Sequence, residues 1–341
     1  MSEKILVIQT AFIGDAVLTL PLLQKIKEKY PGSSLDVLCT PITFEIFNSS
    51  DVVNNAIVLD KKAEHKSLFS LLKFAKILKK NNYSRIYSPH RSTRTSLLVL
   101  QLGVKESYGF DTSSLKHVYK NLVNYNSDHH EVQRNLDLLA DFSENKWKII
   151  PQINIPTSIK NKVNLFLDKL SGEESYAAIA PGSVWNTKKY PKEYYKEVLK
   201  YLETKFDLIF IIGGKEDKNI CDEIADFSPR SMSVAGEFSI IESIEFLKRM
   251  KLLLTNDSAP THFGMCADIP VLTVYCSTTP EFGFYPYNNK SSFISFDGLS
   301  CKPCGIHGFD SCPLKHFDCG VRLTPDLVIK KIKEMMNETN L

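Results

Sequence analysis

The chain has 341 residues, of which 43% are apolar and 24% charged. At about 150 residues per domain, this length predicts two domains, and the composition excludes a disulfide-stapled miniprotein, a disordered chain and a fibrous one. The net charge of +3 is too small to favour a nucleic-acid partner. Because the chain has no run of 18 apolar residues and no signal-like start, we expect a cytosolic protein.

Charge differs between the two halves. Residues 1–150 carry 20 Lys and Arg against 15 Asp and Glu, a balance of +5, whereas residues 151–341 carry 22 against 24. Five of the eight histidines also lie in the first half. The first half is therefore the more plausible site for a modestly anionic partner, although chance explains the bias equally well.

The first half alternates short apolar runs with segments of helical periodicity. We expect strands at 4–9, 35–39, 56–59 and 85–88, and helices at 15–30, near Thr43, at 66–80, 94–102 and 131–142, with a less regular stretch before the last helix. Such alternation predicts parallel strands joined by right-handed helical crossovers.

A second alternating series follows a linker at 149–156, where two prolines and β-branched neighbours favour extended chain. We expect strands at 176–180, 208–212, 252–255 and 271–275, and helices at 192–204, 217–227, 240–250, 260–267 and 325–336. The predicted domains are 1–150 and 157–323. Segment 324–341 forms a C-terminal helix that could pack back on the N-terminal domain.

Two doubly wound sheets in series would present the carboxyl ends of their strands to a shared central cleft, where ligands of open α/β sheets bind. Asp15 follows the first expected strand and starts a helix. The helix dipole favours its ionised form, which could accept a proton from a substrate hydroxyl. A plain helix cap is the alternative interpretation.

Polar loops follow the strands of the second domain. Ser183 and Thr187 could donate hydrogen bonds to phosphate oxygens, and Lys188 could neutralise a diphosphate, unless it is only a solvated lysine. Asp217 or Glu216 could accept hydrogen bonds from ribose hydroxyls. The chain has no GxGxxG and no P-loop at these positions, which argues against dehydrogenases and Walker-type hydrolases.

A third polar stretch, 254–262, runs from a buried strand into a helix. Asp257 and Ser258 occupy its cap positions, and the N–H groups of Ser258, Ala259 and Thr261 could bind an anion. A second polar turn at 277–280 includes Thr278, so a diphosphate could bridge the two turns. His262 is in reach of the same anion, with a buried structural histidine as the alternative.

As a set, these residues resemble the ADP-heptose:lipopolysaccharide heptosyltransferases, glycosyltransferase family 9, especially the heptosyltransferase II type. The resemblance covers nearly the whole chain. Its motifs are Ile13-Gly14-Asp15 with Leu18 to Pro21, Pro181-Gly182-Ser183 with Lys188 to Pro191, and Thr255 to Ser258 with His262, Ala267, Pro270 and Ser277 to Pro280.

The resemblance implies a GT-B fold and an inverting, metal-independent transfer of heptose that needs no cofactor. It implies that Asp15 is the general base and that Lys188 meets the donor phosphates. The ADP-heptose donor would contact Ser183, Thr187, Asp217, Asp257, Ser258, Ala259, His262 and Thr278. Many members have glycine where Ala259 stands, and its methyl group could crowd the phosphate or sugar, so the donor sugar stays open.

The acceptor implied by the resemblance is the anionic lipopolysaccharide core, with peripheral contact at the cytoplasmic face of the inner membrane and no nucleic-acid partner. Its contacts would come from Arg91, Arg94, His130 and Arg134. Two alternatives remain: the same fold with another nucleotide sugar, and a non-catalytic nucleotide-sugar or glycan-binding protein. The latter would keep the 257–262 cradle but would not need a carboxylate at Asp15.

Cysteines gather near the C-terminus. Cys301 and Cys304 form a C-x2-C pair, followed by Cys312 and Cys319, with His307 and His316 nearby. These four thiols could hold a structural zinc ion, with free thiols as the alternative. We expect no catalytic role for a metal.

Overall fold

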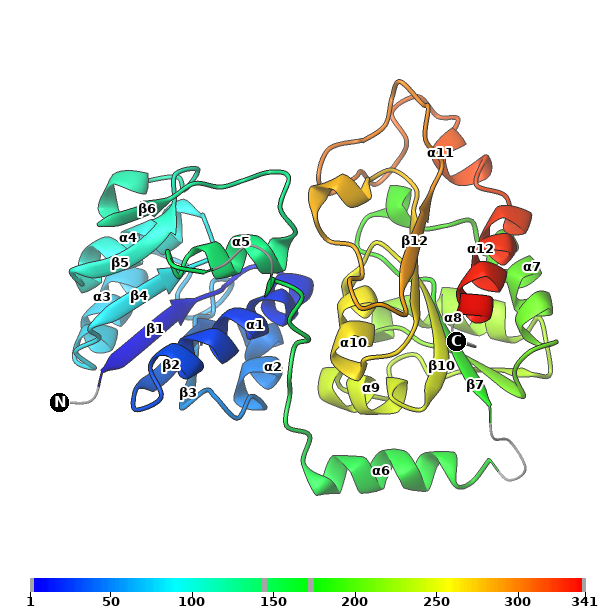
Figure 1. The fold of residues 1–341 in the computed structure, drawn as a ribbon, viewed down its shortest axis with the longest axis horizontal. Coiled ribbons are helices and arrows are strands. Elements are labelled where there is room, and N and C mark those ends of the chain that lie inside the picture. Colours follow the sequence, from blue (N-terminus) through cyan, green and yellow to red (C-terminus); the bar gives the residue numbers. More distant parts are fainter. Residues whose placement is uncertain (1–2, 143–145, 171–174, 339–341) are drawn as a thin grey trace. The chain divides into compact units, whose positions relative to one another are not determined.

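The computed structural model describes residues 3–142, 146–170 and 175–338. The chain divides into two compact units, 1–154 and 155–341, and the division falls within segment 149–156. Each unit holds one parallel six-stranded sheet flanked by helices (Figure 1). The predicted pair of doubly wound α/β sheets is therefore confirmed.

In unit 1 the winding direction of the sheet reverses between its first and fourth strands. The order is β3-β2-β1-β4-β5-β6. Chain segments that follow β1 and β4 therefore lie side by side at the carboxyl edge, where open α/β sheets bind ligands. The strands are β1 (Lys4–Ile8), β2 (Ser34–Cys39), β3 (Asn55–Val58), β4 (Arg85–Ser88), β5 (Glu106–Phe110) and β6 (Asn121–Val123).

The helices of unit 1 follow the predicted alternation, with two differences. Strands β5 and β6 lie in the stretch expected to be irregular, because neither has a continuous apolar run. The helix expected at 131–142 ends at Asp137, and Ala140 has a left-handed φ of 63° that no α-helix accommodates. The helices are α1 (Ile13–Lys29), α2 (Phe44–Asn48), α3 (Leu68–Lys79), α4 (Thr93–Leu102) and α5 (Glu131–Asp137), with 3₁₀ turns η1 (Pro41–Thr43) and η2 (Lys116–Val118).

Unit 2 repeats the same topology. Its order, β12-β11-β10-β7-β8-β9, reverses between β7 and β10, the first and fourth strands of the unit. The strands are β7 (Tyr176–Ala180), β8 (Leu208–Ile211), β9 (Ser231–Ser233), β10 (Met250–Asn256), β11 (Val271–Tyr275) and β12 (Ser292–Ser295). The short edge strands β9 and β12 are rich in serine, which explains why hydrophobic periodicity did not predict them.

Most helices of unit 2 match the sequence prediction, but α6 and α11 were not expected. The helices are α6 (Thr157–Leu167), α7 (Lys192–Leu202), α8 (Lys218–Ala225), α9 (Ile240–Leu247), α10 (Ala259–Ala267), α11 (Asp318–Val321) and α12 (Pro325–Glu338), with 3₁₀ turns η4 (Asn186–Lys188), η5 (Lys215–Asp217) and η6 (Pro280–Phe282). Within the described residues, no helix combines the length and apolar character needed to cross a membrane.

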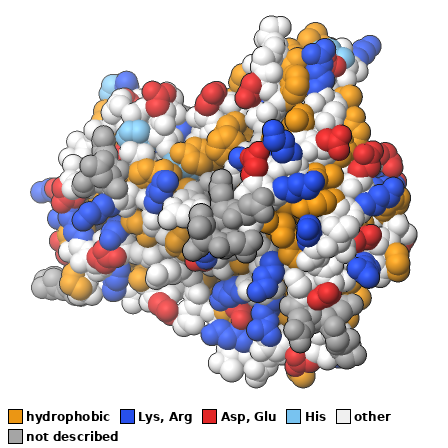
Figure 2. All heavy atoms as spheres, turned by 45° about the vertical axis from the view of Figure 1, so that its right-hand side comes forward, with side chains coloured by type: hydrophobic (Ala, Val, Ile, Leu, Met, Phe, Trp, Pro, Cys, Tyr) orange, Lys and Arg blue, Asp and Glu red, His pale blue; other side chains and the backbone are white. Residues whose placement is uncertain are grey.

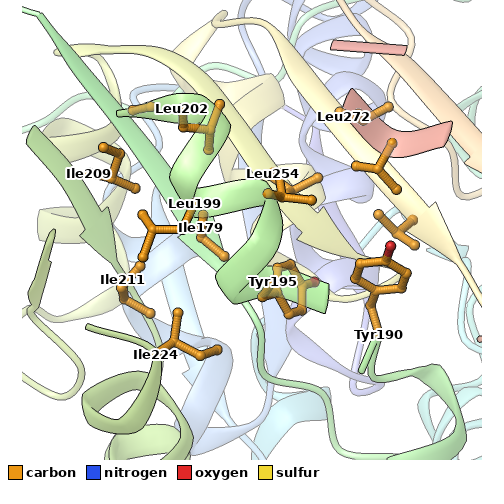
Figure 3. Close-up of a cluster of buried hydrophobic side chains, with 14 of the residues drawn as sticks. Ile179, Tyr190, Tyr195, Leu199, Leu202, Ile209, Ile211, Ile224, Leu254 and Leu272 are labelled. Atoms are coloured by element: carbon orange, nitrogen blue, oxygen red, sulfur yellow. The ribbon is translucent and has the colours of Figure 1, made fainter. Parts of the chain in front are cut away.

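A hydrophobic core of unit 2 lies between its sheet and the helices α7, α8 and α12. Figure 3 shows Ile179 and Leu254 from neighbouring strands packed against Tyr195 and Leu199 of α7. The C-terminal helix joins the same core through Val328, Ile332 and Met335. Its apolar face is thus buried within unit 2, whereas the sequence analysis allowed for packing on the N-terminal domain.

Acidic and basic side chains are both present on the face drawn in Figure 2, as expected for a chain of 42 basic and 39 acidic residues.

Asn256, the last residue of β10, ties the strand ends of unit 2 together. Its Oδ1 accepts hydrogen bonds from Tyr190 N at 2.9 Å and Tyr195 Oη at 2.8 Å, and its Nδ2 donates to Pro181 O at 2.7 Å. Asn256 is completely buried, so water cannot replace these bonds. The amide therefore fixes the two polar loops after β7 and β10 against each other.

We expect Asn256→Ala to lower the free energy of unfolding of unit 2 by about 3 kcal/mol, because buried partners lose their hydrogen bonds. Urea unfolding followed by the fluorescence of Trp185 in a Trp147→Phe background measures this, with Asn161→Ala on the exposed side of α6 as the matched control. The control should stay within about 0.5 kcal/mol of the parent. Equal effects of the two variants would contradict the bracing role.

Candidate functional site

The carboxyl edge of unit 1 brings together polar groups that follow β1 and β4. His90 Nδ1 lies 2.9 Å from both Thr10 Oγ1 and Thr95 Oγ1, and Lys61 Nζ donates to Thr10 O at 2.5 Å. Burial, with the positive charges of Lys61 and Arg91, lowers the pKa of His90 to about 4. His90 is therefore neutral at physiological pH and acts as a hydrogen-bonding group.

Asp15 lies in the first turn of α1, at the same carboxyl edge. Its Oδ2 accepts a hydrogen bond from Phe12 N at 3.2 Å, so the carboxylate caps its helix. The side chain is only half-buried. Capping and proton acceptance are compatible, because a carboxylate has further lone pairs beyond the one that Phe12 uses.

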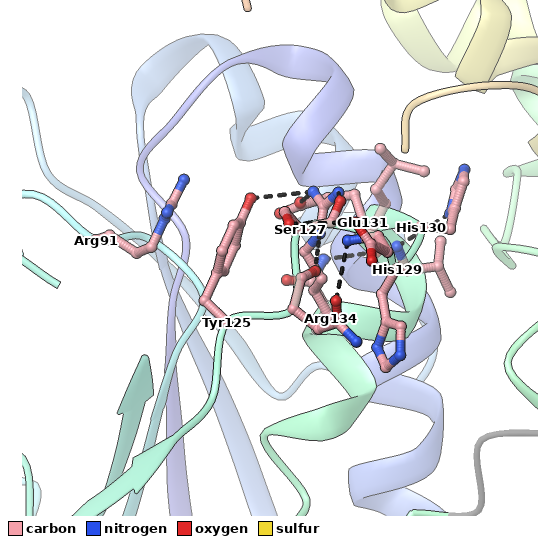
Figure 4. A network of polar contacts seen from close by, with 12 residues as sticks. Arg91, Tyr125, Ser127, His129, His130, Glu131 and Arg134 are labelled. Atoms are coloured by element: carbon pink, nitrogen blue, oxygen red, sulfur yellow. Dashed lines mark hydrogen bonds and ion pairs between the residues drawn. The ribbon is translucent and has the colours of Figure 1, made fainter. Parts of the chain in front are cut away.

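A buried network on α5 and the segment before it lies beside α1 (Figure 4). Arg134 is only 2% exposed, and its guanidinium donates to Glu131 Oε2 at 2.7 Å and to Tyr125 Oη at 3.0 Å. Two further bonds, both 3.0 Å, reach the carbonyls of Asn126 and Ser127. Asn135 Nδ2 donates to Leu18 O at 3.0 Å and joins α5 to α1.

These contacts change the interpretation of the four residues predicted to bind the acceptor. Arg134 is committed to internal partners, and His130 is buried, caps α5 by accepting from Val132 N at 3.2 Å and stacks on Trp147. Arg91 is partly exposed, bonds Thr112 Oγ1 at 3.1 Å and lies 3.9 Å from the Tyr125 ring centre. Arg94 donates to the carbonyls of His65 and Lys66. Only the two partly exposed arginines are placed to meet a ligand directly.

The structure adds two groups that the sequence analysis did not single out. Lys61 joins Arg91 and Arg94 at the carboxyl edge, and its pKa is lowered by burial and by the charges of Arg94 and Lys62. Glu131 is buried, and its pKa is raised to about 7 by burial first and then by the negative charge of Asp15, against the opposing effects of Arg134 and Arg91. The sequence carries one signal for this pair, because Glu131 lies three residues before Arg134 and side chains at that spacing meet on one face of a helix.

Glu131 predicts a pH-dependent stability. A carboxyl group whose pKa is raised on folding stabilises the native state fully below its unfolded value, near 4.5, and this contribution is lost as the pH rises to about 7. In Glu131→Gln the contribution is absent. The stability advantage of the parent over the variant should therefore fall by up to about 3 kcal/mol across this window.

Urea unfolding at a series of pH values tests this, followed by the fluorescence of Trp147 in a Trp185→Phe background, because Trp147 stacks on His130 beside the network. Glu64→Gln, at an exposed position of the same unit, is the matched control and should keep the parental pH profile. Parallel profiles for the parent and Glu131→Gln would contradict the argument.

In unit 2 the carboxyl edge holds a buried ion pair. Lys188 Nζ lies 2.7 Å from Asp257 Oδ2, and Thr278 Oγ1 donates to the same oxygen at 2.7 Å. Lys188 follows β7, Asp257 follows β10 and Thr278 follows β11, so the reversal of the sheet brings them together. Thr278 is completely buried and orients the carboxylate.

The N-terminus of α10 lies beside this pair. Thr261 N donates to Ser258 O at 3.0 Å, so the prediction that its N–H stays available for an anion is wrong. Ser258 and Ala259 keep N–H groups with no backbone acceptor in the described chain. His262 is buried, with no partner for Nδ1 in the described chain, and burial lowers its pKa to about 4.

Thr187, predicted to bind phosphate, makes hydrogen bonds within unit 2 that the sequence analysis did not predict. Its Oγ1 accepts from Phe309 N at 2.8 Å and from Ser277 Oγ at 3.0 Å. The segment around Phe309 thereby braces the turn that carries Lys188. His307 lies in this segment, and its pKa is lowered by burial and by the charge of Lys188, so it belongs to the same site.

Asp217 and Ser183 lie at the neighbouring turns. Asp217 Oδ2 accepts from Gly214 N at 3.1 Å, and the carboxyl group packs so closely on Gly182 that any Cβ there would lie 2.3 Å from it. A larger residue at 182 would therefore displace the Asp217 carboxyl group from this position. Ser183 Oγ is partly exposed and accepts from Trp185 N at 3.4 Å.

The structure does not support the predicted zinc site. The four thiols line one pocket of about 260 Å³, but no group of three or more His, Cys, Asp or Glu within the described ranges is arranged to hold a metal ion. Burial raises the pKa of Cys319 to about 11 and also raises that of Cys304, whereas hydrogen bonds from backbone N–H groups outweigh burial at Cys312 and lower its pKa. All four are free cysteines.

The sequence is similar to known glycosyltransferases. A model of glycosyltransferase family 9 (heptosyltransferase) matches residues 71–308. Lipooligosaccharide heptosyltransferase 2 of Campylobacter jejuni is 23% identical over 97% of this chain and 99% of its own. Lipopolysaccharide heptosyltransferase 2 of Escherichia coli K12 is 22% identical over 85% of this chain and 87% of its own.

Solved structures agree with the fold. A family 9 glycosyl transferase from Veillonella parvula superimposes with a TM-score of 0.86 at 19% identity, over 99% of this chain and 98% of its own. The E. coli ADP-heptose lps heptosyltransferase II gives a TM-score of 0.79 at 19% identity, over 99% of this chain and 100% of its own. These matches confirm the GT-B architecture. Since the family model covers more than two thirds of the sequence, the chain belongs to glycosyltransferase family 9, the heptosyltransferases, and is a glycosyltransferase.

Proposed function

We propose that the protein transfers heptose from ADP-heptose to the anionic inner core of lipopolysaccharide, with inversion and without a metal ion, at the cytoplasmic face of the inner membrane. The observation that carries this proposal is the buried Lys188–Asp257 pair beside the N-terminus of α10. It provides a fixed cation next to free backbone N–H groups, which together suit a diphosphate.

The donor diphosphate would bind to unit 2. Asp257 holds the Lys188 ammonium group in place before the donor arrives, so the lysine side chain loses little conformational entropy on binding. The N–H groups of Ser258 and Ala259 would donate to phosphate oxygens, and neutral His262 could add a hydrogen bond without adding charge. Ser183 would meet the phosphates from the facing turn, and Asp217 the ribose.

Asp15 would act as general base in unit 1. It would take the proton from an acceptor hydroxyl while that oxygen attacks the anomeric carbon, and the bond from that carbon to the diphosphate oxygen would break. Attack on the face opposite to the leaving group inverts the configuration at the anomeric carbon. Each carboxyl edge carries polar groups that this mechanism needs, Asp15 in unit 1 and Lys188 in unit 2.

The anionic acceptor would bind beside Asp15. Arg91, Arg94 and Lys61 form the basic part of this edge and are partly exposed, which suits phosphate or carboxylate groups of the core. Arg134 and His130 would act indirectly, by holding α5 and Glu131 against the first turn of α1.

Asp15→Asn tests the base. The variant should lose transfer by about 10²-fold to 10⁴-fold, because the amide cannot accept the proton, whereas the affinity for ADP-heptose should stay within a few fold. Transfer is measured with purified acceptor, and donor binding by calorimetry. Asp326→Asn is the matched control, since it changes an exposed aspartate in the first turn of α12.

Retained turnover in Asp15→Asn would remove this residue from the role of base. Donor binding without turnover in the parent protein, over a panel of acceptors, would instead favour a non-catalytic binding protein. Binding of another nucleotide sugar in preference to ADP-heptose would favour the alternative donor, to which the methyl group of Ala259 would be better suited.

Lys188→Gln tests the electrostatic role of the cation. Loss of the positive charge should lower kcat by about 10²-fold to 10³-fold, because the ammonium group would no longer stabilise the negative charge on the departing diphosphate. Lys189→Gln, at the adjacent and also partly buried position, is the control and should keep most of the activity. For the parent enzyme, a chelator should leave transfer unchanged, and a strict requirement for Mg²⁺ or Mn²⁺ would contradict the mechanism.

A further inference from the structure

Residues 61–80 concentrate the positive charge of the first half of the chain. These twenty residues contain seven lysines and one glutamate, a balance of +6, whereas the whole of residues 1–150 has a balance of only +5. The rest of unit 1 is therefore close to neutral, and its basic character comes from a single surface segment. Helix α3 forms the main part of this segment.

Helix α3 has an ordinary buried side and an unusual outer side. Leu71, Ala75 and Leu78 pack into the core of unit 1. The opposite side carries Phe69, Lys73, Lys76 and Lys80 at helical spacing, flanked by Leu68 and Ile77, and these six residues form what we call the outer face of α3. Phe69 is 80% exposed, Leu68 58% and Ile77 57%.

The lysines of this face are not neutralised within the protein. Across the described residues, no ion pair involves Lys73, Lys76, Lys79 or Lys80. Exposed lysines elsewhere do find acidic partners, such as Lys192 with Glu223 on α7 and α8. Unpaired lysines interleaved with exposed apolar side chains leave both a charge and an apolar surface without a partner.

We propose that the outer face of α3 docks on an anionic lipid surface, with Phe69, Leu68 and Ile77 inserted at the level of the headgroups and the lysines on the lipid phosphates. This pattern is that of helices that lie in the plane of a membrane interface. The inference deepens the proposed function, on which it rests for the lipid nature of the acceptor. The face would hold unit 1 at the surface from which a lipid-linked acceptor is presented.

Charge and chemistry favour lipid over other occupants. A second copy of the chain would place lysine opposite lysine across a symmetric interface, which is unfavourable. Nucleic acid could meet the lysines and stack a base on Phe69, but it would leave the exposed aliphatic side chains of Leu68 and Ile77 without an apolar partner. A phospholipid surface complements both the lysines and the apolar side chains.

Co-sedimentation with vesicles of phosphatidylglycerol and phosphatidylethanolamine in equal parts tests the inference, without nucleotide sugar or acceptor. The parent protein should bind these vesicles and bind phosphatidylcholine vesicles far more weakly. Phe69→Ser should weaken binding about tenfold or more, and the double variant Lys73→Gln with Lys76→Gln about 25-fold, since each surface lysine contributes about fivefold.

Two matched controls lie on unit 2. Leu165→Ser removes an apolar side chain that is 64% exposed on α6, and Lys205→Gln with Lys330→Gln removes two exposed lysines. Both should bind vesicles as the parent does. All variants should keep the parental circular dichroism and transfer heptose to a delipidated, water-soluble acceptor at the parental rate.

Several outcomes would overturn the inference: no binding of anionic vesicles by the parent, parental binding by the α3 variants, or equal loss in the controls. Concentration-dependent dimerisation abolished by Phe69→Ser, without vesicle binding, would assign the face to a second copy. Oligonucleotide binding abolished by the lysine variant, without vesicle binding, would assign it to nucleic acid. Because vesicle binding needs no substrate, it can fail or succeed independently of the transfer reaction.

Discussion

The reversal of winding within each sheet is the constraint on which the candidate site depends. In both units the first and fourth strands are neighbours whose following segments turn to opposite sides, which leaves their carboxyl ends open. In unit 1 this places Thr10 against His90, and in unit 2 it places Pro181 against Asn256. Residues more than 70 positions apart in the sequence thereby become hydrogen-bonded partners.

Burial then determines the charge of the groups at these edges. His90 and His262 are neutral because burial disfavours their protonated forms and lowers both pKa values to about 4, even though the charge of Asp257 opposes this at His262. Lys188 is held by an ion pair with Asp257 in a largely buried place. The edge of unit 2 thus offers an ammonium group held by the Asp257 carboxylate, next to neutral hydrogen-bond donors, and both kinds of group can donate to a leaving group that gains negative charge.

The edge of unit 1 has a different electrostatic character. Asp15 lies near a second carboxyl group, Glu131, whose negative charge is balanced by Arg134 from the same helix. The electrostatic interaction between two carboxyl groups is mutual, so the charge on Glu131 also changes the electrostatic potential at Asp15. A family 9 glycosyltransferase that uses Asp15 as base would therefore depend on a network that never touches the substrate.

The sequence by itself determined the class of fold, the alternation of strands and helices, and most residues of the candidate site, because hydrophobic periodicity and turn motifs are local properties. It could not predict the short edge strands β6, β9 and β12, whose stability comes from pairing with a neighbour and not from their own apolar runs. Tertiary structure alone decided that Arg134 is buried with Glu131. It also decided that the N–H of Thr261 donates to Ser258 O and that Thr187 Oγ1 accepts from Phe309 N. Each of these outcomes depends on which partner comes within hydrogen-bonding distance, and that distance is set by packing between distant segments, which no local pattern encodes.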